Sequence, residues 1–455
     1  MVIAAADILV EVSPAEVRAA LMDKDGELVK FFVERTHRQS LVGSIYSGRV
    51  VALDRASDGA FIDIGLTETA YLPRAKNVTE GQVVVVQVVR DGWSGKSAVV
   101  TRTPVLQGRY LSYQARGKGV QAERGFGKGR RMTEVAKVLG EQTSGRITIR
   151  RPALKINQDT ILRELTTLRK LWEALVSAAT TCKSTTCLLP APDLVKRLLR
   201  DQMPAEEIYV DGREIFITMK KMIDDHYPDL RGKLEFYDRK SPIFEESGVE
   251  DKLAPALERT VALGNGSRLI FDETEALVSI DIDSGSVSGG PDSVRRANMA
   301  AMGEIAKQLI LRNLAGLIVI DPISMSNRGH RKQMVNALRQ AIRFDDHAVD
   351  VLGMGPAGLI EMTRQRSGLS LGGQLLKQAQ LSATLSAETD AAALLRKALR
   401  LNGPGRQVAV VPPKIAAALE GPLKDALAQT GQLLGQGLEI RPDETKKMSD
   451  VFLER

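Results

Sequence analysis

The sequence has few cysteines, few histidines and no long apolar run, and these scarcities exclude several classes of protein. Cys182 and Cys187 are the only cysteines among 455 residues, which excludes a disulfide framework and fits a reducing compartment. The longest apolar runs, such as 83–86 and 317–320, are far too short to span a bilayer. The first residues also lack the basic and apolar regions of a signal peptide, so we expect a cytoplasmic protein without a membrane partner.

The scarcity of histidine and cysteine also limits the chemistry. The four histidines (His37, His226, His330 and His347) show none of the spacings of metal ligands, and the two cysteines have no second pair beside them. Zinc is therefore not expected. The glycine fingerprints of phosphate-binding loops and of dinucleotide-binding domains are absent as well.

The length of 455 residues suggests about three domains.

The sequence also contains a concentration of positive charge. Residues 108–155 carry twelve lysines and arginines and three glutamates. The net charge of this segment, 12 − 3 = +9, exceeds the net charge of +7 of the whole chain. Because such cations bind phosphates with release of counterions, the segment predicts a polyanion-binding surface, with Tyr110, Tyr113 and Phe126 available to stack on bases. A solvated, glycine-rich loop is the alternative, and the charge alone leaves both open.

Residues 43–103 have the pattern of an all-β domain. Five short alternating runs are separated by glycine and aspartate turns, as in a small closed barrel such as an OB-fold. Phe61 and Tyr71 fall on two of these runs. They could stack on single-stranded bases or fill the barrel core, and the pattern leaves both open.

Turn residues and apolar spacing predict further elements outside the barrel. Asp25-Gly26 between two β-type runs predicts a hairpin. Apolar residues three and four apart predict a helix over 159–179, and we also expect helices over 193–201 and 251–263 and a strand over 207–210.

A strand–helix–strand pattern stands out in the second half of the chain. Residues 276–283 alternate as a strand, 292–313 form a long amphipathic helix, and 317–321 form a fully apolar strand that ends in aspartate. This length and order are typical of a parallel crossover unit.

Three aspartates fall near the carboxyl ends of these two strands. Asp281 and Asp283 share one face of the first strand, and Asp321 ends the second. Ligands of open α/β sheets bind at this edge, and three carboxylates gathered there would repel unless a cation neutralised them. Mg²⁺ suits such ligands and can activate a water for phosphodiester cleavage. The alternative is that the aspartates only cap turns and helices.

Residues 269–370 strongly resemble the catalytic domain of the bacterial ribonuclease E/G family of endoribonucleases. The matching blocks are 273–284, 304–309, 313–321 and 358–366. Several blocks in order are more specific than one short motif. Weaker similarity covers nearly the whole chain and includes a C-terminal block at 408–420.

The resemblance implies Mg²⁺-dependent cleavage of single-stranded RNA in RNA processing or decay. Two metal-binding aspartates of the family fall on Asp281 and Asp321, and an asparagine near the scissile phosphate falls on Asp283. The products implied are a 5′-phosphate and a 3′-hydroxyl. The catalytic residues expected are therefore Asp281, Asp283 and Asp321.

The resemblance also implies where RNA is bound. The aromatic residues and the lysine that line the family's OB-fold surface match Phe61, Tyr71 and Lys96. The arginine of a pocket that senses a 5′-monophosphate matches Arg150, while Arg151 stands where the family has threonine.

The fold implied is a multidomain α/β protein. Its expected parts are a ribonuclease-H-like domain (1–35 with 190–256), an OB-fold (36–105), a basic 5′-sensor-like domain (106–189), a deoxyribonuclease-I-like catalytic domain (257–375) and a small C-terminal α/β domain (390–455).

The sequence also departs from the family pattern. Asp283 replaces the asparagine, Ser324 stands where an acidic residue is typical, and no cysteine follows Cys187 to form the family's zinc link. The resemblance therefore favours a ribonuclease G-like member of the shorter branch and excludes a zinc-linked dimer, while another homo-oligomer stays open. Because the departures lie near the expected metal, the alternative function is an RNA-binding protein that has lost catalysis.

Overall fold

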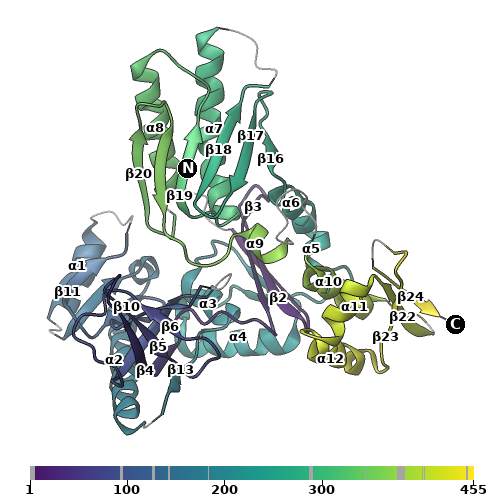
Figure 1. The fold of residues 1–455 in the computed structure, drawn as a ribbon, viewed down its shortest axis with the longest axis horizontal. Coiled ribbons are helices and arrows are strands. Elements are labelled where there is room, and N and C mark those ends of the chain that lie inside the picture. Colours follow the sequence, from purple (N-terminus) through teal and green to yellow (C-terminus); the bar gives the residue numbers. More distant parts are fainter. Residues whose placement is uncertain are drawn as a thin grey trace. The chain divides into compact units, whose positions relative to one another are not determined.

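The computed structural model describes residues 6–92, 96–124, 129–141, 144–182, 184–285, 290–343, 345–376, 385–401, 403, 405–446 and 449–454 (Figure 1). The chain is mixed α/β and divides into two compact units. One unit comprises 1–39, 204–216 and 233–455, and the other comprises 40–203 and 217–232. Within the described ranges, no helix has the length and apolar character needed to cross a membrane.

The second unit contains a closed barrel. Its strands, in hydrogen-bonded order, are β4 (Ile45–Asp54), β5 (Gly59–Asp63), β6 (Ala70–Leu72), β8 (Val99–Thr101) and β7 (Val83–Arg90). Pairing of β7 with β4 closes the ring, and β13 (Thr186–Leu189) extends the sheet beside β4. The predicted five-stranded barrel is confirmed, and it is consistent with an OB-like domain because alternate residues such as Ala60 and Ile62 fill its core.

A four-stranded sheet follows the barrel. Its order is β11 (Lys118–Ala122), β12 (Gly145–Ile149), β10 (Leu111–Gln114) and β9 (Leu106–Gln107). The helices of this unit are α1 (Arg130–Gly140), η1 (Arg151–Lys155), α2 (Gln158–Thr181), α3 (Leu194–Asp201) and η2 (Pro228–Leu230). The predicted helices over 159–179 and 193–201 are confirmed. Their N-caps are Asn157 and Asp193, whose side chains accept the backbone N–H groups of Thr160 and Lys196.

The predicted role of two tyrosines in this unit is wrong. Tyr110 and Tyr113 are 1% and 6% exposed, inside the core between the four-stranded sheet and α2. The Tyr110 hydroxyl donates to the Asp229 carboxylate at 2.5 Å. Neither ring is available to stack on a base, because the core side chains of the sheet and of α2 cover both. The sequence pattern did not reveal that these two positions would be covered. Phe126 lies outside the described residues.

The first unit begins with a five-stranded sheet. Its order is β15 (Leu234–Phe236), β14 (Ile208–Val210), β1 (Asp7–Val12), β2 (Glu16–Met22) and β3 (Leu28–Arg35). The predicted hairpin at Asp25-Gly26 is confirmed between β2 and β3, where Gly26 has a φ of +75°. The predicted strand over 207–210 is β14. Helix α4 (Arg213–His226) begins in this unit and ends in the other, and α5 (Ile243–Glu246) and α6 (Val249–Ala256) follow in this unit.

A six-stranded sheet contains the predicted crossover unit. Its order is β16 (Thr260–Ala262), β17 (Arg268–Glu273), β18 (Leu277–Asp283), β19 (Gly316–Asp321), β21 (Ile360–Arg364) and β20 (Val349–Met354). Helix α7 (Pro291–Leu311) connects β18 to the parallel β19 and lies beside α8 (Arg328–Ile342) (Figure 1). Apolar residues of β18, β19, α7 and α8 share one core, so the predicted parallel unit is confirmed.

The predicted helix over 251–263 is partly wrong. Helix α6 ends at Ala256, and 260–262 form the edge strand β16. Pro255 stands in the last turn of α6 and has no N–H to continue the helix. Val261 then pairs with Leu269 on the neighbouring antiparallel strand β17, so 260–262 form one arm of a hairpin that the helical spacing did not reveal.

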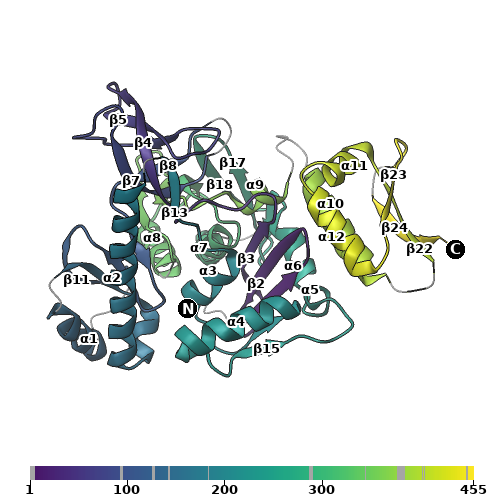
Figure 2. The same cartoon turned by 90° about the horizontal axis from the view of Figure 1, so that it is seen from below.

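The C-terminal part packs helices on a small sheet (Figure 2). A short helix, α9 (Leu371–Leu375), precedes it. The strand order is β23 (Glu439–Pro442), β22 (Arg406–Val411) and β24 (Asp450–Glu454), and the helices are α10 (Ala387–Arg400), α11 (Pro413–Glu420) and α12 (Lys424–Leu434). Buried side chains such as Leu395, Val411 and Leu419 form its core.

Candidate functional site

The structure brings Asp281 and Asp321 together on neighbouring strands. Their Cα atoms are register partners at the end of the parallel pair β18 and β19. Ile280 and Ile282 on either side of Asp281 are 1% and 3% exposed, so the alternation turns Asp281 away from the core. Asp321 is exposed as well. Two carboxylates therefore lie side by side at the carboxyl edge of the sheet, where ligands of α/β proteins bind.

The charges of the site favour a bound cation. Burial, together with the neighbouring charges of Asp321 and Asp283, raises the pKa of Asp281 above its ordinary value. A cation between Asp281 and Asp321 would relieve this repulsion. Mg²⁺ fits, since it uses one or two carboxylates and keeps waters and phosphate oxygens as its other ligands. Among the described residues, no group of three or more His, Cys, Asp or Glu side chains could hold a metal ion.

The third predicted carboxylate, Asp283, is neutralised by the protein itself. Nε and Nη2 of Arg268 donate to its Oδ2 at 2.8 and 2.6 Å, and the backbone N–H of Gly285 donates to its Oδ1 at 2.8 Å. The Gly285 N–H and the Arg268 guanidinium hold the pKa of Asp283 below its usual range. Arg268 is thus a positive partner of one of the three carboxylates, and the catalytic role of Asp283 stays a prediction. Sequence reasoning missed Arg268, whose partner is set by the register of β17 against β18.

A buried amide fixes the chain just after Asp321. Asn298 on α7 is fully buried, and its side chain donates to the Ile323 carbonyl at 2.8 Å and accepts the Ile323 N–H at 3.1 Å. Two hydrogen bonds to one residue hold the backbone that leaves β19. Asn298 is thus a positioning residue that the sequence pattern did not reveal, because it lies 25 residues from its partner.

Asn298→Ala is expected to lower the free energy of unfolding by about 1–3 kcal/mol, because it leaves the N–H and carbonyl of Ile323 without partners. Urea unfolding measures this loss. Ser324→Ala is the control, since Ser324 is exposed and its loss should cost less than about 0.5 kcal/mol. Equal stability of Asn298→Ala and wild type would contradict the positioning role.

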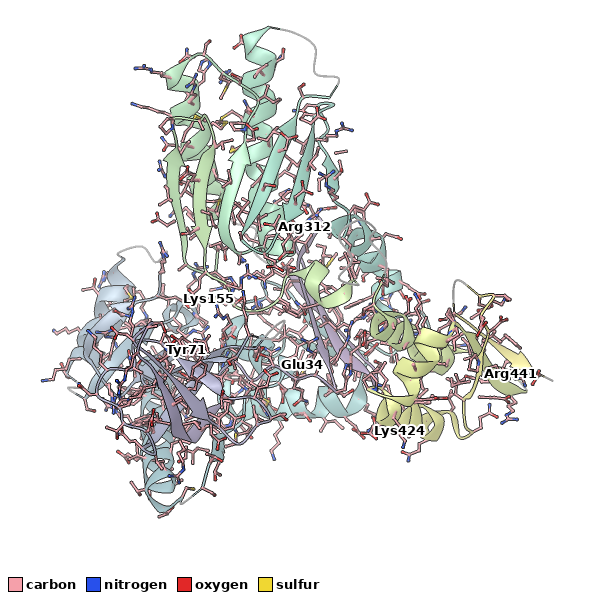
Figure 3. The ribbon with its side chains drawn as sticks, in the orientation of Figure 1. Glu34, Tyr71, Lys155, Arg312, Lys424 and Arg441 are labelled. Carbon is pink, nitrogen blue, oxygen red and sulfur yellow. The ribbon has the colours of Figure 1, made fainter. Side chains whose placement is uncertain are left out.

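The two predicted barrel aromatics form a pair outside the barrel core. Phe61 and Tyr71 are register partners on β5 and β6, with ring centroids 5.6 Å apart (Tyr71 is labelled in Figure 3). Both remain partly exposed, so they do not fill the barrel. Lys96 is exposed, two residues before Ala98, whose carbonyl accepts the Tyr71 N–H at 2.7 Å. These three residues therefore belong to one region of the barrel.

Arg150, the arginine predicted to sense a 5′-monophosphate, is largely buried and bonded within the protein. The Arg150 side chain is 12% exposed and donates to Asp201 at 2.9 Å and to the Gly108 carbonyl at 2.5 Å. Burial lowers the pKa of Arg150, but the charges of Asp201 and Glu123 raise it by more. The Arg151 backbone N–H donates to Glu123 at 3.1 Å, and its side chain is half-buried. Arg150 is thus paired with carboxylates, and the 5′-end sensing stays a prediction.

The fold and the site define a mixed α/β protein with an OB-like barrel and an exposed aspartate pair at a sheet edge. The sequence pattern of the Ribonuclease E/G family matches residues 105–367, which include both aspartates. Ribonuclease G of Salmonella typhimurium (strain SL1344) and of Escherichia coli (strain K12) are each 30% identical over 98% of this chain and 99% of their own. Ribonuclease E of Escherichia coli (strain K12) is 29% identical over 78% of this chain and 36% of its own. The chain belongs to the ribonuclease E/G family.

Proposed function

We propose that the protein is an endoribonuclease that cleaves single-stranded RNA with Mg²⁺ held by Asp281 and Asp321. The observation that carries the proposal is the register pairing of these two aspartates within the segment that matches the family. The similarity to proteins named ribonuclease G over nearly the full chain supports the same activity. RNA processing or decay is the cellular role that fits it.

The sheets support an assignment of domains. The mixed sheet of β1–β3 with β14 and β15 would form the ribonuclease-H-like part, and the barrel would form the OB-fold. The sheet of β9–β12 would form the 5′-sensor-like part, and the sheet of β16–β21 the deoxyribonuclease-I-like catalytic part.

Different residues of the chain would bind the metal ion and the RNA. Asp281 and Asp321 would hold the ion through their carboxylates, and Asn298 would keep the backbone after Asp321 in place. Bound there, Mg²⁺ supplies a water of lowered pKa and stabilises charge on the phosphodiester. Phe61 and Tyr71 would hold RNA bases by stacking, which suits single strands whose bases are unpaired.

The ends of the products test the reaction. An unstructured RNA incubated with the protein and Mg²⁺ should give internal fragments with a 5′-phosphate and a 3′-hydroxyl, and EDTA should stop the reaction. Fragments with a 2′,3′-cyclic phosphate, or cleavage that continues in EDTA, would contradict the metal-bound aspartate pair.

A second function, an RNA-binding protein without catalysis, is favoured by two observations. Asp283 is bound by Arg268, and the exposed Ser324 stands where the resemblance implies an acidic residue. Binding of RNA in a gel shift without cleavage in Mg²⁺ would support this alternative. Its affinity should fall by roughly 0.7 log unit per contacted phosphate for each decade of salt.

Phe61→Ala is expected to weaken RNA binding by about 5- to 150-fold, because loss of one stacked base costs about 1–3 kcal/mol. Fluorescence anisotropy in EDTA measures the affinity without cleavage. Phe452→Ala is the matched control, since Phe452 on β24 is 40% exposed and lies outside the barrel. Similar losses in both variants would argue against a specific role of the aromatic pair.

A further inference from the structure

The ion pair of Arg268 and Asp283 is built into the strand edge beside the aspartate pair. Arg268 begins β17 and lies directly opposite Asp283 at the end of β18. Both bonds from the guanidinium reach Oδ2, and Gly285 occupies Oδ1, so each oxygen of Asp283 already accepts a hydrogen bond. Asp283 is therefore poorly suited to be a metal ligand and well suited to orient an arginine.

The turns that carry the pair are packed tightly. Gly285 has a φ of +52°, and a Cβ at this position would lie 2.3 Å from the Gly266 carbonyl oxygen. Ser267, which is 2% exposed, donates to the side chain of Asn265 through both its N–H and its hydroxyl. The backbone on either side of the ion pair is therefore fixed by close packing and hydrogen bonds.

The Arg268 guanidinium could bind a ligand in addition to Asp283. Its side chain is 54% exposed, and the two bonds to Asp283 use two of the five N–H donors of a guanidinium. A guanidinium suits phosphate oxygens in geometry and charge. Asp281 and Asp283 share one face of β18, so the guanidinium stands beside the proposed metal site.

We infer that Arg268 binds a phosphate of the RNA at this site and that Asp283 is the positioning residue that holds its guanidinium. The inference rests on the proposed function, which supplies the RNA. Arg268 and Asp283 would act as one unit, because an unpaired Asp283 would repel the phosphate and an unpaired Arg268 would lose its orientation.

Three variants test this unit: Arg268→Gln, Asp283→Asn, and the double variant Arg268→Gln/Asp283→Asn. The first readout is RNA affinity in EDTA, which does not depend on catalysis. Arg268→Gln should bind about tenfold more weakly or worse, and the double variant should recover part of this loss because it removes the unpaired carboxylate. The slope of log affinity against log salt should fall by about 0.7 in Arg268→Gln, as for one lost phosphate contact.

The second readout separates binding from chemistry. In Mg²⁺, Arg268→Gln should raise KM more than it lowers kcat, and Asp283→Asn should leave KM closer to wild type than Arg268→Gln does. Arg441→Gln is the matched control, since Arg441 forms a similar exposed pair with Glu454 on the C-terminal sheet. It should leave affinity, salt slope and KM unchanged.

An unchanged salt slope in Arg268→Gln, or a double variant that binds no better than Arg268→Gln, would overturn the inference. Failure of the proposed function would give a different experimental result from failure of this inference. If the wild-type protein binds RNA but does not cleave it, the measurements in EDTA still decide the role of Arg268.

Discussion

Asp321→Asn is expected to lower the rate of RNA cleavage by roughly a thousandfold or more, while RNA affinity in EDTA stays close to that of wild type. A metal ion at such a site contributes several kcal/mol to the transition state, and each 1.4 kcal/mol is about a tenfold change in rate. The amide removes one of the two carboxylates that would hold the ion. Single-turnover cleavage and anisotropy measure the two quantities separately.

Asp281→Asn should have the same effect on cleavage but should not destabilise the fold. Burial, together with the charges of Asp321 and Asp283, raises the pKa of Asp281, so removal of its charge relieves both the desolvation of the carboxylate and its repulsion by its neighbours in the protein without metal. The thermal midpoint without metal should stay equal or rise slightly. Asp350→Asn is the control, because Asp350 is an exposed aspartate on β20 of the same sheet. Full activity in either Asp281→Asn or Asp321→Asn would contradict the assignment.

Arg364→Met is expected to lower the free energy of unfolding by about 3–5 kcal/mol, because it leaves a buried charge without its partner. Arg364 is 3% exposed and donates to Asp345 at 2.7 and 3.2 Å and to the Asn313 side chain at 3.0 Å. The Asp345 side chain is itself only 2% exposed. Urea unfolding measures the loss. Adding Asp345→Asn should recover part of it, and purely additive losses would contradict the coupling.

The same pair predicts a dependence of stability on pH. Burial raises the pKa of Asp345, but hydrogen bonds from His347 and Arg364 lower it by more, so the folded pKa lies below the ordinary value. A depressed folded pKa stabilises the protein above the unfolded pKa of about 3.9, and this stabilisation is lost as the pH falls through the folded pKa. Wild type should therefore lose more stability than Asp345→Asn when the pH is lowered below about 4.

Local patterns predicted the parts of the fold that depend on neighbours in sequence. Alternation and turn residues gave the barrel strands and the pair β18 and β19, and from these the adjacency of Asp281 and Asp321 followed. The amphipathic spacing gave α2, and the Asp25-Gly26 turn gave the first hairpin.

The parts that sequence could not predict depend on contacts between distant residues. Arg150 meets Asp201, which is 51 residues away, and Asn298 meets Ile323 across a helix and a strand. The burial of Tyr113 on β10 follows from the way α2 covers the sheet, and the alternation of β10 alone does not specify which face is covered. The Arg268 partner of Asp283 likewise required the strand register.

The most direct test of the account uses one short, AU-rich, 5′-monophosphorylated RNA with the wild-type protein and with Asp321→Asn, each in Mg²⁺ and in EDTA. The account predicts internal cleavage by the wild-type protein in Mg²⁺ alone and none by the variant. Absence of cleavage by wild type in Mg²⁺, or equal cleavage by Asp321→Asn, would contradict it.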